Sequence, residues 1–116
     1  QPDYMSLKFR PVGGDYNTYS VGAAADIPVM RVEEMYLIEA EAVGASQNVA
    51  AGVQLLNNFM KQYRQSNYNF STGDLRNFQL EVLKQMRIEF WGEGIAFPTA
   101  KRLKPDVIQN YEGTNL

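Results

Sequence analysis

Two glutamates near the C-terminal end of the chain have a spacing that suits chemistry. Glu89 and Glu93 lie four residues apart, within a stretch rich in aromatic and basic residues that runs from Gln85 to Leu103. Residues at this spacing meet on one face of a helix. Glycoside hydrolases generally use two carboxylates, but these flank a substrate cleft instead of neighbouring each other on one helix. We therefore predict no catalytic residue in this chain.

Basic residues are available as partners for these carboxylates. Charged side chains that meet between helices are more often structural ion pairs than catalytic groups. We predict a structural ion-pair network that ties the first predicted helix to the third. Its predicted members are Arg31, Glu34, Glu41, Arg87, Glu89, Glu93 and Arg102, with Lys101 as a further cation.

The composition narrows the function classes. The chain has 116 residues, which suits one domain, and a net charge of −2, which attracts neither nucleic acid nor an anionic membrane surface. It has no cysteine and no histidine, which excludes disulfides, cysteine nucleophiles, Cys/His zinc sites and histidine acid–base chemistry. Gly92, Glu93 and Gly94 follow a predicted helix and include no lysine, so they do not form a phosphate loop. We expect no metal, no cofactor and no nucleic-acid partner.

The first two predicted helices form a pair. One is expected over residues 28–43, because Asp26 can cap it and Gly44 can end it, and another over residues 49–65, capped by Asn48. The short link between them predicts antiparallel neighbours of tetratricopeptide type. The predicted apolar faces are Val29, Val32, Met35, Tyr36, Ile38, Ala40, Ala42 and Val43, and then Val49, Val53, Leu56, Met60 and Tyr63. Small residues near the junction should let the two backbones approach closely: Ala40, Ala42, Ala45, Ala50, Ala51 and Gly52.

A third long helix is expected over residues 75–92, capped by Asp74. Phe97 and Pro98 are expected to stop the helical pattern. Its predicted apolar face comprises Leu75, Phe78, Val82, Leu83, Met86, Ile88 and Phe90. Residues 4–11 alternate loosely and predict a short strand, and residues 104–116 predict an irregular tail. The predicted fold class is mainly α: an antiparallel helix pair, a third long helix, a short N-terminal strand and a tail.

Several aromatic residues have two interpretations. Tyr16, Tyr19, Tyr68 and Phe70 lie in predicted loops, where they can stack against a sugar ring or supply buried area, and we predict packing. Trp91 is predicted to lie in the core or at a helix junction. Three methionines at helical spacing are also predicted to be core residues: Met35, Met60 and Met86.

Three stretches, in order, resemble the C-terminal part of the SusD/RagB family. Residues 7–10 resemble the family's strand, residues 27–42 its helix motif IPvlRlaEmYLirAEA, and residues 86–103 its segment RRxEfxgEGxrfxDlkRl. Leu56 and Asn57 lie where the family has its usual Leu-Asn pair. The chain departs from the family's usual residues at Met86, Ala96, Thr99 and Ala100.

The resemblance implies a non-enzymatic role. Such proteins are surface lipoproteins of the outer membrane of Bacteroidota, where they hold an oligosaccharide or similar nutrient and cap a TonB-dependent transporter that imports it. The family generally holds its sugar outside the matched stretches, so no ligand-contacting residue carries over. Residues 1–116 are then expected to form a single domain, the C-terminal portion of a longer protein whose lipid anchor lies upstream. The alternatives are a tetratricopeptide-like scaffold that binds another protein, and an enzyme fragment that depends on Glu89 or Glu93.

Overall fold

The structure consists of helices joined by short connections. The computed structural model describes residues 29–105, and within that range it contains the helices α2 (Val32–Ser46), α3 (Val49–Tyr63), α4 (Leu75–Glu89) and α5 (Ala96–Leu103). The prediction of a mainly helical fold, with a helix pair and a third long helix, is confirmed. The predicted strand over residues 4–11 and the tail beyond residue 105 lie outside the described residues.

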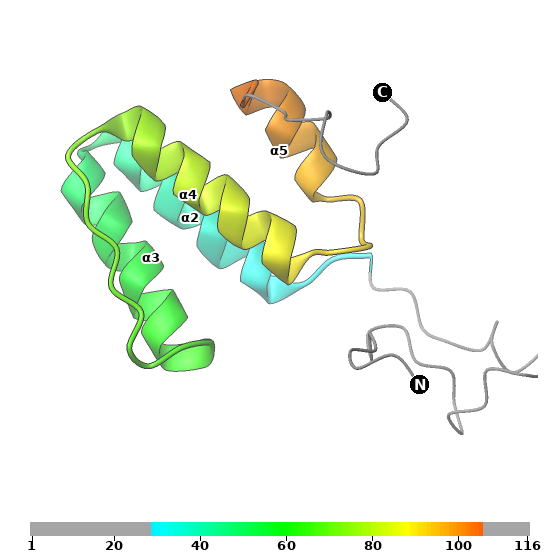
Figure 1. The fold of residues 1–116 in the computed structure, drawn as a ribbon, viewed down its shortest axis with the longest axis horizontal. Helices are drawn as coiled ribbons and strands as arrows, with labels where there is room; N and C mark the ends of the chain where they lie inside the picture. Colours follow the sequence, from blue (N-terminus) through cyan, green and yellow to red (C-terminus); the bar gives the residue numbers. More distant parts are fainter. Residues whose placement is uncertain (1–28, 106–116) are drawn as a thin grey trace, which may run out of the picture.

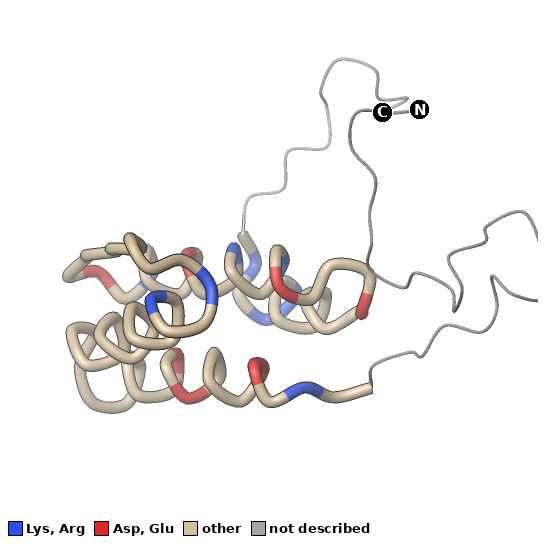
Figure 2. The backbone as a smooth tube through the Cα atoms, turned by 90° about the horizontal axis from the view of Figure 1, so that it is seen from below, with Lys and Arg blue, Asp and Glu red and all other residues tan. Residues whose placement is uncertain are grey.

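The helices α2, α3 and α4 pack together, and α5 packs on α4. The chain reverses direction between α2 and α3, and the loop over residues 64–74 then runs back along α3 (Figure 1). As a result, α4 begins near the α2–α3 junction and lies beside α2 (Figure 1). The charged residues of α2 are all acidic and those of α5 are all basic, whereas α4 carries both signs (Figure 2).

The predicted N-caps of α3 and α4 are confirmed. The side chain of Asn48 accepts a hydrogen bond of 2.8 Å from the backbone N–H of Ala51, and the side chain of Asp74 accepts one of 2.8 Å from the N–H of Asn77. Each cap satisfies one of the first backbone N–H groups, which have no partner inside the helix. The starts of these two helices are therefore determined by local sequence.

The start of α2 differs from the prediction. The helix begins at Val32 instead of Pro28, and the residue before it, Arg31, is extended (φ −132°, ψ 148°) and makes no side-chain cap. An arginine side chain has no acceptor for a backbone N–H, and that of Arg31 reaches to the end of α4, where it donates to Glu89. The predicted cap, Asp26, lies outside the described residues. A tertiary contact therefore replaces the local signal at this end.

The helix α5 contradicts the prediction that Phe97 and Pro98 stop the helical pattern. Pro98 lies in the first turn of α5, where its missing N–H would have no partner inside the helix. The break comes earlier, because α4 ends at Glu89, three residues before the predicted end. Gly92 and Gly94 then adopt positive φ angles of 78° and 79°, which glycine tolerates without strain, and they carry the turn into α5.

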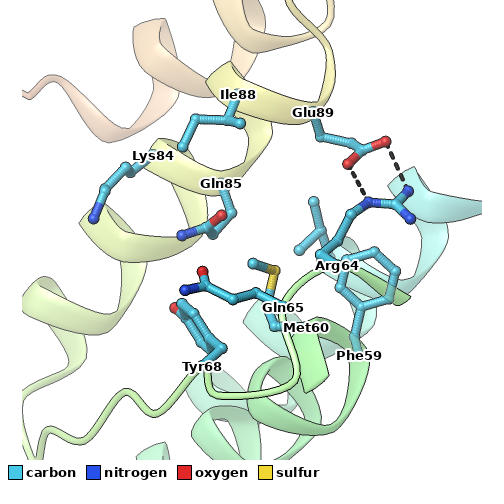
Figure 3. Close-up of a pocket in the computed structure, with 10 residues that line it drawn as sticks. Phe59, Met60, Arg64, Gln65, Tyr68, Lys84, Gln85, Ile88 and Glu89 are labelled. Carbon is cyan, nitrogen blue, oxygen red and sulfur yellow. Dashed lines mark hydrogen bonds and ion pairs between the residues drawn. The ribbon is translucent and has the colours of Figure 1, made fainter. Parts of the chain in front are cut away.

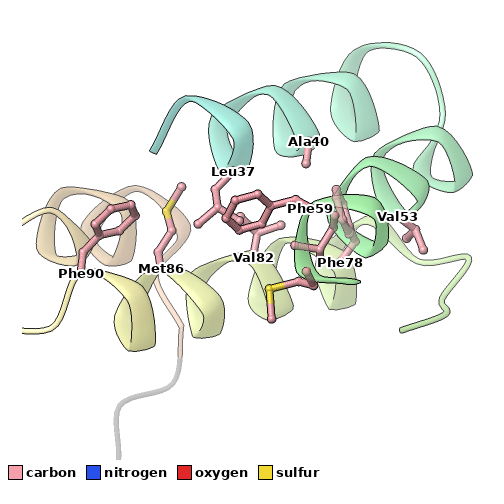
Figure 4. Packing of buried hydrophobic residues seen from close by; sticks show 10 residues of the cluster. Leu37, Ala40, Val53, Phe59, Phe78, Val82, Met86 and Phe90 are labelled. Carbon is pink, nitrogen blue, oxygen red and sulfur yellow. The ribbon is translucent and has the colours of Figure 1, made fainter. Parts of the chain in front are cut away.

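The core lies between α2, α3 and α4 (Figure 4). Leu37 of α2, Leu56 of α3, and Phe78 and Val82 of α4 are each at most 1% exposed. Burial of such a side chain stabilises the fold by about 1.5 to 3 kcal/mol. The complete cluster is Leu37, Ala40, Val53, Leu56, Phe59, Met60, Phe78, Val82, Met86 and Phe90. The predicted apolar faces of α3 and α4 are thus confirmed over their central turns.

The predicted apolar face of the first helix is mostly wrong. Leu37 and Ala40 face the core, whereas Val32, Met35 and Ile38 are 65%, 46% and 45% exposed. The helix is apolar around most of its circumference, so the spacing of its apolar residues does not single out one face. Some other residues that were predicted to lie on apolar faces are also exposed: Val29, Tyr36, Ala42, Tyr63, Leu75 and Ile88.

The aromatic residues of the loops have mixed outcomes. Tyr68 and Phe70 are partly buried against the core, as predicted, whereas Tyr16 and Tyr19 lie outside the described residues. Trp91 is 60% exposed, which contradicts its predicted place in the core. The reason is that α4 has already ended at Glu89, so Trp91 follows the last turn that reaches the core.

Two glycines set the distance between α2 and α3. Gly44 does not end the first helix as predicted, but lies buried within α2, where a Cβ atom would overlap the ring of Phe78. Gly52 of α3 faces it, and a Cβ atom there would lie 2.6 Å from Gly44 Cα and 2.7 Å from the carbonyl oxygen of Ala40. Side chains do not fit at such distances. The predicted close approach of the two backbones is therefore confirmed.

Replacing Gly52 with alanine should destabilise the fold by about 2 kcal/mol or more, because the added methyl group meets backbone atoms that cannot move aside. In an unconstrained helix the same change would stabilise by about 1 kcal/mol. Urea denaturation measures the difference. Gly73→Ala is the matched control, because no atom lies within 4 Å of a Cβ at that position. Equal stability of both variants would contradict the proposed close contact.

Candidate functional site

A polar cluster joins the ends of three helices. Arg31 donates from Nη1 to Glu89 Oε1 (2.9 Å) and from Nη2 to the backbone carbonyl of Glu89 (2.8 Å). Its Nε and Nη2 also donate to the two carboxylate oxygens of Glu93, at 3.1 Å each. The guanidinium carbon lies 4.9 Å from the ring centroid of Phe90. A single arginine therefore holds both glutamates at the end of α4.

Arg64, which follows α3, brings a second guanidinium to the same carboxylate. Its Nε and Nη2 donate to Glu89 at 2.6 Å and 2.9 Å, and its Nη2 also donates to Glu33 Oε1 at 3.1 Å. Glu33 lies in the first turn of α2, where a negative charge interacts favourably with the helix dipole. Glu89 consequently links the beginning of α2, the end of α3 and the end of α4.

The electrostatics agree with these contacts. Hydrogen bonding from Arg64, and then from Arg31, holds the pKa of the Glu89 carboxyl below its ordinary value, although burial opposes the shift. Burial acts to lower the pKa of Arg31, but hydrogen bonds to Glu93 and Glu89 outweigh it and raise that pKa. The pKa of Arg64 is also raised, chiefly by its hydrogen bond to Glu89. All three groups are therefore charged at neutral pH.

A separate ion pair connects α5 to α2. Arg102 donates from Nη1 and Nη2 to the two oxygens of Glu41, at 2.8 Å and 2.7 Å. Bidentate pairs of this kind are the strong ones, and hydrogen bonding to Glu41 raises the pKa of Arg102. The pair borders a groove of about 400 Å³ between α2, α4 and α5, lined also by Ile38, Met86 and Thr99.

The sequence-predicted network residues thus divide into groups. The structure brings together Arg31, Glu89 and Glu93 in one cluster, and Arg102 with Glu41 in a separate pair. Within residues 29–105, the predicted members whose side chains form no ion pair are Glu34, Arg87 and Lys101. That these residues serve only a structural role remains a prediction.

Glu33 and Arg64 belong to the cluster but are absent from the predicted network. The partners of Arg64 are 25 and 31 residues away along the chain, so no helical spacing connects them. The one available signal was that Arg64 lies at the end of a predicted helix, where a basic residue interacts favourably with the helix dipole. Its partners depend on how α2 and α4 pack, which a local pattern does not contain.

Beside the cluster lies a pocket of about 340 Å³ between α3, α4 and the loop that joins them (Figure 3). Phe59, Met60 and Ile88 supply apolar surface, and polar side chains border it. The polar lining residues are Arg64, Gln65, Tyr68, Lys84, Gln85 and Glu89. Its size and mixed lining are in the range of small-molecule sites.

Most of the polar groups in this pocket already have internal partners. Arg64 is bound to Glu89, and both the Tyr68 hydroxyl and Gln85 Nε2 donate to Glu81 Oε1, at 2.8 Å and 2.9 Å. Burial, and then the hydrogen bond to Glu81, raises the pKa of Tyr68, so its hydroxyl stays protonated. These contacts position the loop against α4 and leave few donors for a ligand.

Glu89 and Glu93 do not lie across a cleft from each other. Glu89 and Glu93 share one guanidinium, and the side chain of Glu93 is only 1% exposed. Among residues 29–105 there is no group of carboxylates arranged to hold a metal ion. No helix within that range has the length and apolar character needed to cross a membrane.

Comparison with known protein families shows to which family the chain belongs. The model of the SusD family matches residues 3–109, which is nearly the whole chain. The chain belongs to the SusD family. Members of the SusD family are nutrient-binding proteins that bind glycans at the cell surface. No curated protein and no solved structure matches the chain.

Replacing Glu89 with alanine should destabilise this SusD family chain by about 2 kcal/mol, because Arg31 and Arg64 lose their shared partner while remaining partly buried. The free energy of unfolding in urea measures the loss. Glu39→Ala on the exposed side of α2 is the control, with an expected change within about 0.5 kcal/mol. A loss for Glu89→Ala as small as the control would show that the cluster is only surface charge.

Acidification should remove the stabilisation that Glu89 supplies. Its lowered pKa means that the unfolded chain binds more protons as the pH falls below the ordinary value of 4.5. The stabilisation is complete above that pH and is lost as the pH falls through the pKa of the folded state. Urea midpoints from about pH 6 to about pH 3 should therefore fall more steeply for the natural chain than for Glu89→Gln. Parallel curves would contradict this role.

Proposed function

We propose that this chain is the helical C-terminal portion of a nutrient-binding lipoprotein of the bacterial outer membrane. The protein captures an oligosaccharide and delivers it to a TonB-dependent transporter without catalysing a reaction. The observation that carries the proposal is the match of the SusD family over residues 3–109. In this proposal the lipid anchor lies in a part of the protein that precedes residue 1.

The exposed apolar residues support a role inside a larger protein. Val29, Val32, Trp91 and Phe97 are 89%, 65%, 60% and 73% exposed. Exposed apolar residues in this number are typical of surfaces that another part of a protein covers. In the proposed lipoprotein these residues contact upstream segments, whereas the ion pairs at Glu89 hold the helices in a fixed arrangement for that contact.

Four measurements on the gene and its product test the proposal. The reading frame should continue upstream of the codon for Gln1 to a signal peptide followed by a cysteine that carries lipid. The complete protein should be accessible to protease added to intact cells, and should copurify with a β-barrel transporter. It should also retain soluble polysaccharide in affinity electrophoresis.

A matched control separates this function from the alternative of a protein-binding scaffold. A variant of the complete protein in which the lipid-bearing cysteine is replaced by alanine should still bind polysaccharide but should leave the membrane. A start codon close to Gln1, without a signal peptide, would contradict the proposal and favour a scaffold. Failure of the complete protein to retain any polysaccharide in affinity electrophoresis would also contradict it.

A further inference from the structure

Three aromatic rings meet on one face of the α2–α3 pair. Tyr36 of α2 stacks on Phe59 of α3 with ring centroids 5.4 Å apart and an interplanar angle of 26°. Tyr63 completes the group, with its centroid 5.9 Å from Tyr36 and 5.7 Å from Phe59. Phe59 is 6% exposed, whereas Tyr36 and Tyr63 are 39% and 47% exposed. A buried ring therefore supports two rings that face the solvent, and we call these three residues the aromatic platform.

The platform lines a shallow groove of about 160 Å³ whose other lining residues are mostly polar. They include Glu39 on α2 and Asn58 and Gln62 on α3, and all three are exposed. Within the described part of the chain, no hydrogen bond or ion pair engages these three side chains. They differ in this respect from the adjacent Asn57, whose amide donates to Phe70 O and accepts from Phe70 N.

The availability of these groups separates the groove from the larger pocket between α3 and α4. In that pocket Arg64, Tyr68 and Gln85 donate to glutamates of the chain itself. In the groove, the carboxylate of Glu39 and the amides of Asn58 and Gln62 can accept and donate toward a ligand. The groove is smaller, but it offers exposed rings together with uncommitted polar groups.

The combination of groups selects a class of ligand. A pyranose presents an apolar C–H face, which packs on an aromatic ring, and a rim of hydroxyls, which pair with amides and carboxylates. The lining residues include a glutamate and neither lysine nor arginine, so they offer no cation to balance the charge of an anionic ligand. The chemistry fits a sugar without charge.

We propose that the aromatic platform and its rim bind one ring of a neutral saccharide, with Tyr36 and Tyr63 under the ring and Glu39, Asn58 and Gln62 toward its hydroxyls. This site rests on the proposed function and adds to it a contact in the helical C-terminal portion. A saccharide that carries carboxylates is rejected, because Glu39 repels it and no cation of the groove compensates.

The test is an NMR titration of the 116-residue chain with the neutral hexasaccharides of glucose, mannose and xylose and with hexagalacturonate. The side-chain amide signals of Asn58 and Gln62 should shift with at least one neutral sugar and should not shift with the uronate. Replacing Tyr36 and Tyr63 together with leucine should weaken that binding about tenfold or more, since both stacking surfaces are lost. Trp91→Leu is the matched control, because it removes an exposed ring elsewhere and should leave the titration unchanged.

A second variant guards against a folding defect in the tyrosine double variant. Asn58→Ala with Gln62→Ala changes two exposed side chains without internal contacts, so it should keep the stability of the natural chain and still weaken saccharide binding severalfold. Absence of a shift with all three neutral sugars would overturn the site, and so would equal shifts with the uronate. If the aromatic platform serves only to dock another protein, none of the three neutral sugars should shift these signals.

The complete protein distinguishes this proposal from the proposed function. If polysaccharide binding by the complete protein is unchanged when Tyr36 and Tyr63 are both leucine, the platform is not a sugar site, and capture elsewhere in the protein still stands. If the gene encodes no lipoprotein and its product binds no polysaccharide, the proposed function fails. In that case, a shift of the Asn58 and Gln62 signals in the 116-residue chain would still show whether the aromatic platform binds a saccharide.

Discussion

The carboxylate of Glu89 is the constraint on which the arrangement of the helices depends. It accepts hydrogen bonds from Arg31 and from Arg64, and these come from the beginning of α2 and the end of α3. Each charge is partly withdrawn from water, so each requires a partner at the right distance. The residue before α2, Arg31, is extended, and its side chain, which has no acceptor with which to cap the helix, reaches to the end of α4.

The second constraint is the contact between glycines of α2 and α3. Gly52 lets the two backbones approach closely, and the missing side chain of Gly44 leaves room for the Phe78 ring of α4. The core uses one side of α2, where Leu37 and Ala40 are buried. The opposite side of that helix keeps apolar residues such as Val32 and Ile38 at the surface. A helix that is apolar on both sides suits a position between two layers, and the described residues supply one of them.

Local sequence signals predicted much of the fold. The helix boundaries and ion-pair partners that they did not predict depend on tertiary contacts. Asn48 and Asp74 cap helices where the sequence indicates, because a cap depends only on neighbouring residues. Pro98 lies in the first turn of α5, whereas proline also commonly follows the end of a helix, and the sequence alone does not separate these two roles. In the charged cluster, the pairing of Arg31 with glutamates was expected from residue types. The partners of Arg64 depend on how α2 and α4 pack against the end of α3, which no local pattern contains.

The charged cluster and the aromatic platform are parts of one structure. The guanidinium of Arg64 lies 5.5 Å from the ring centroid of Phe59, and the ring of Tyr36 stacks on that same Phe59. Phe59 therefore has the cation of the cluster and an exposed platform ring as neighbours. Because Glu89 fixes the position of Arg64, it also restricts where Phe59 can lie, and Phe59 in turn supports Tyr36. A rigid support of this kind lowers the entropy lost when exposed rings receive a ligand.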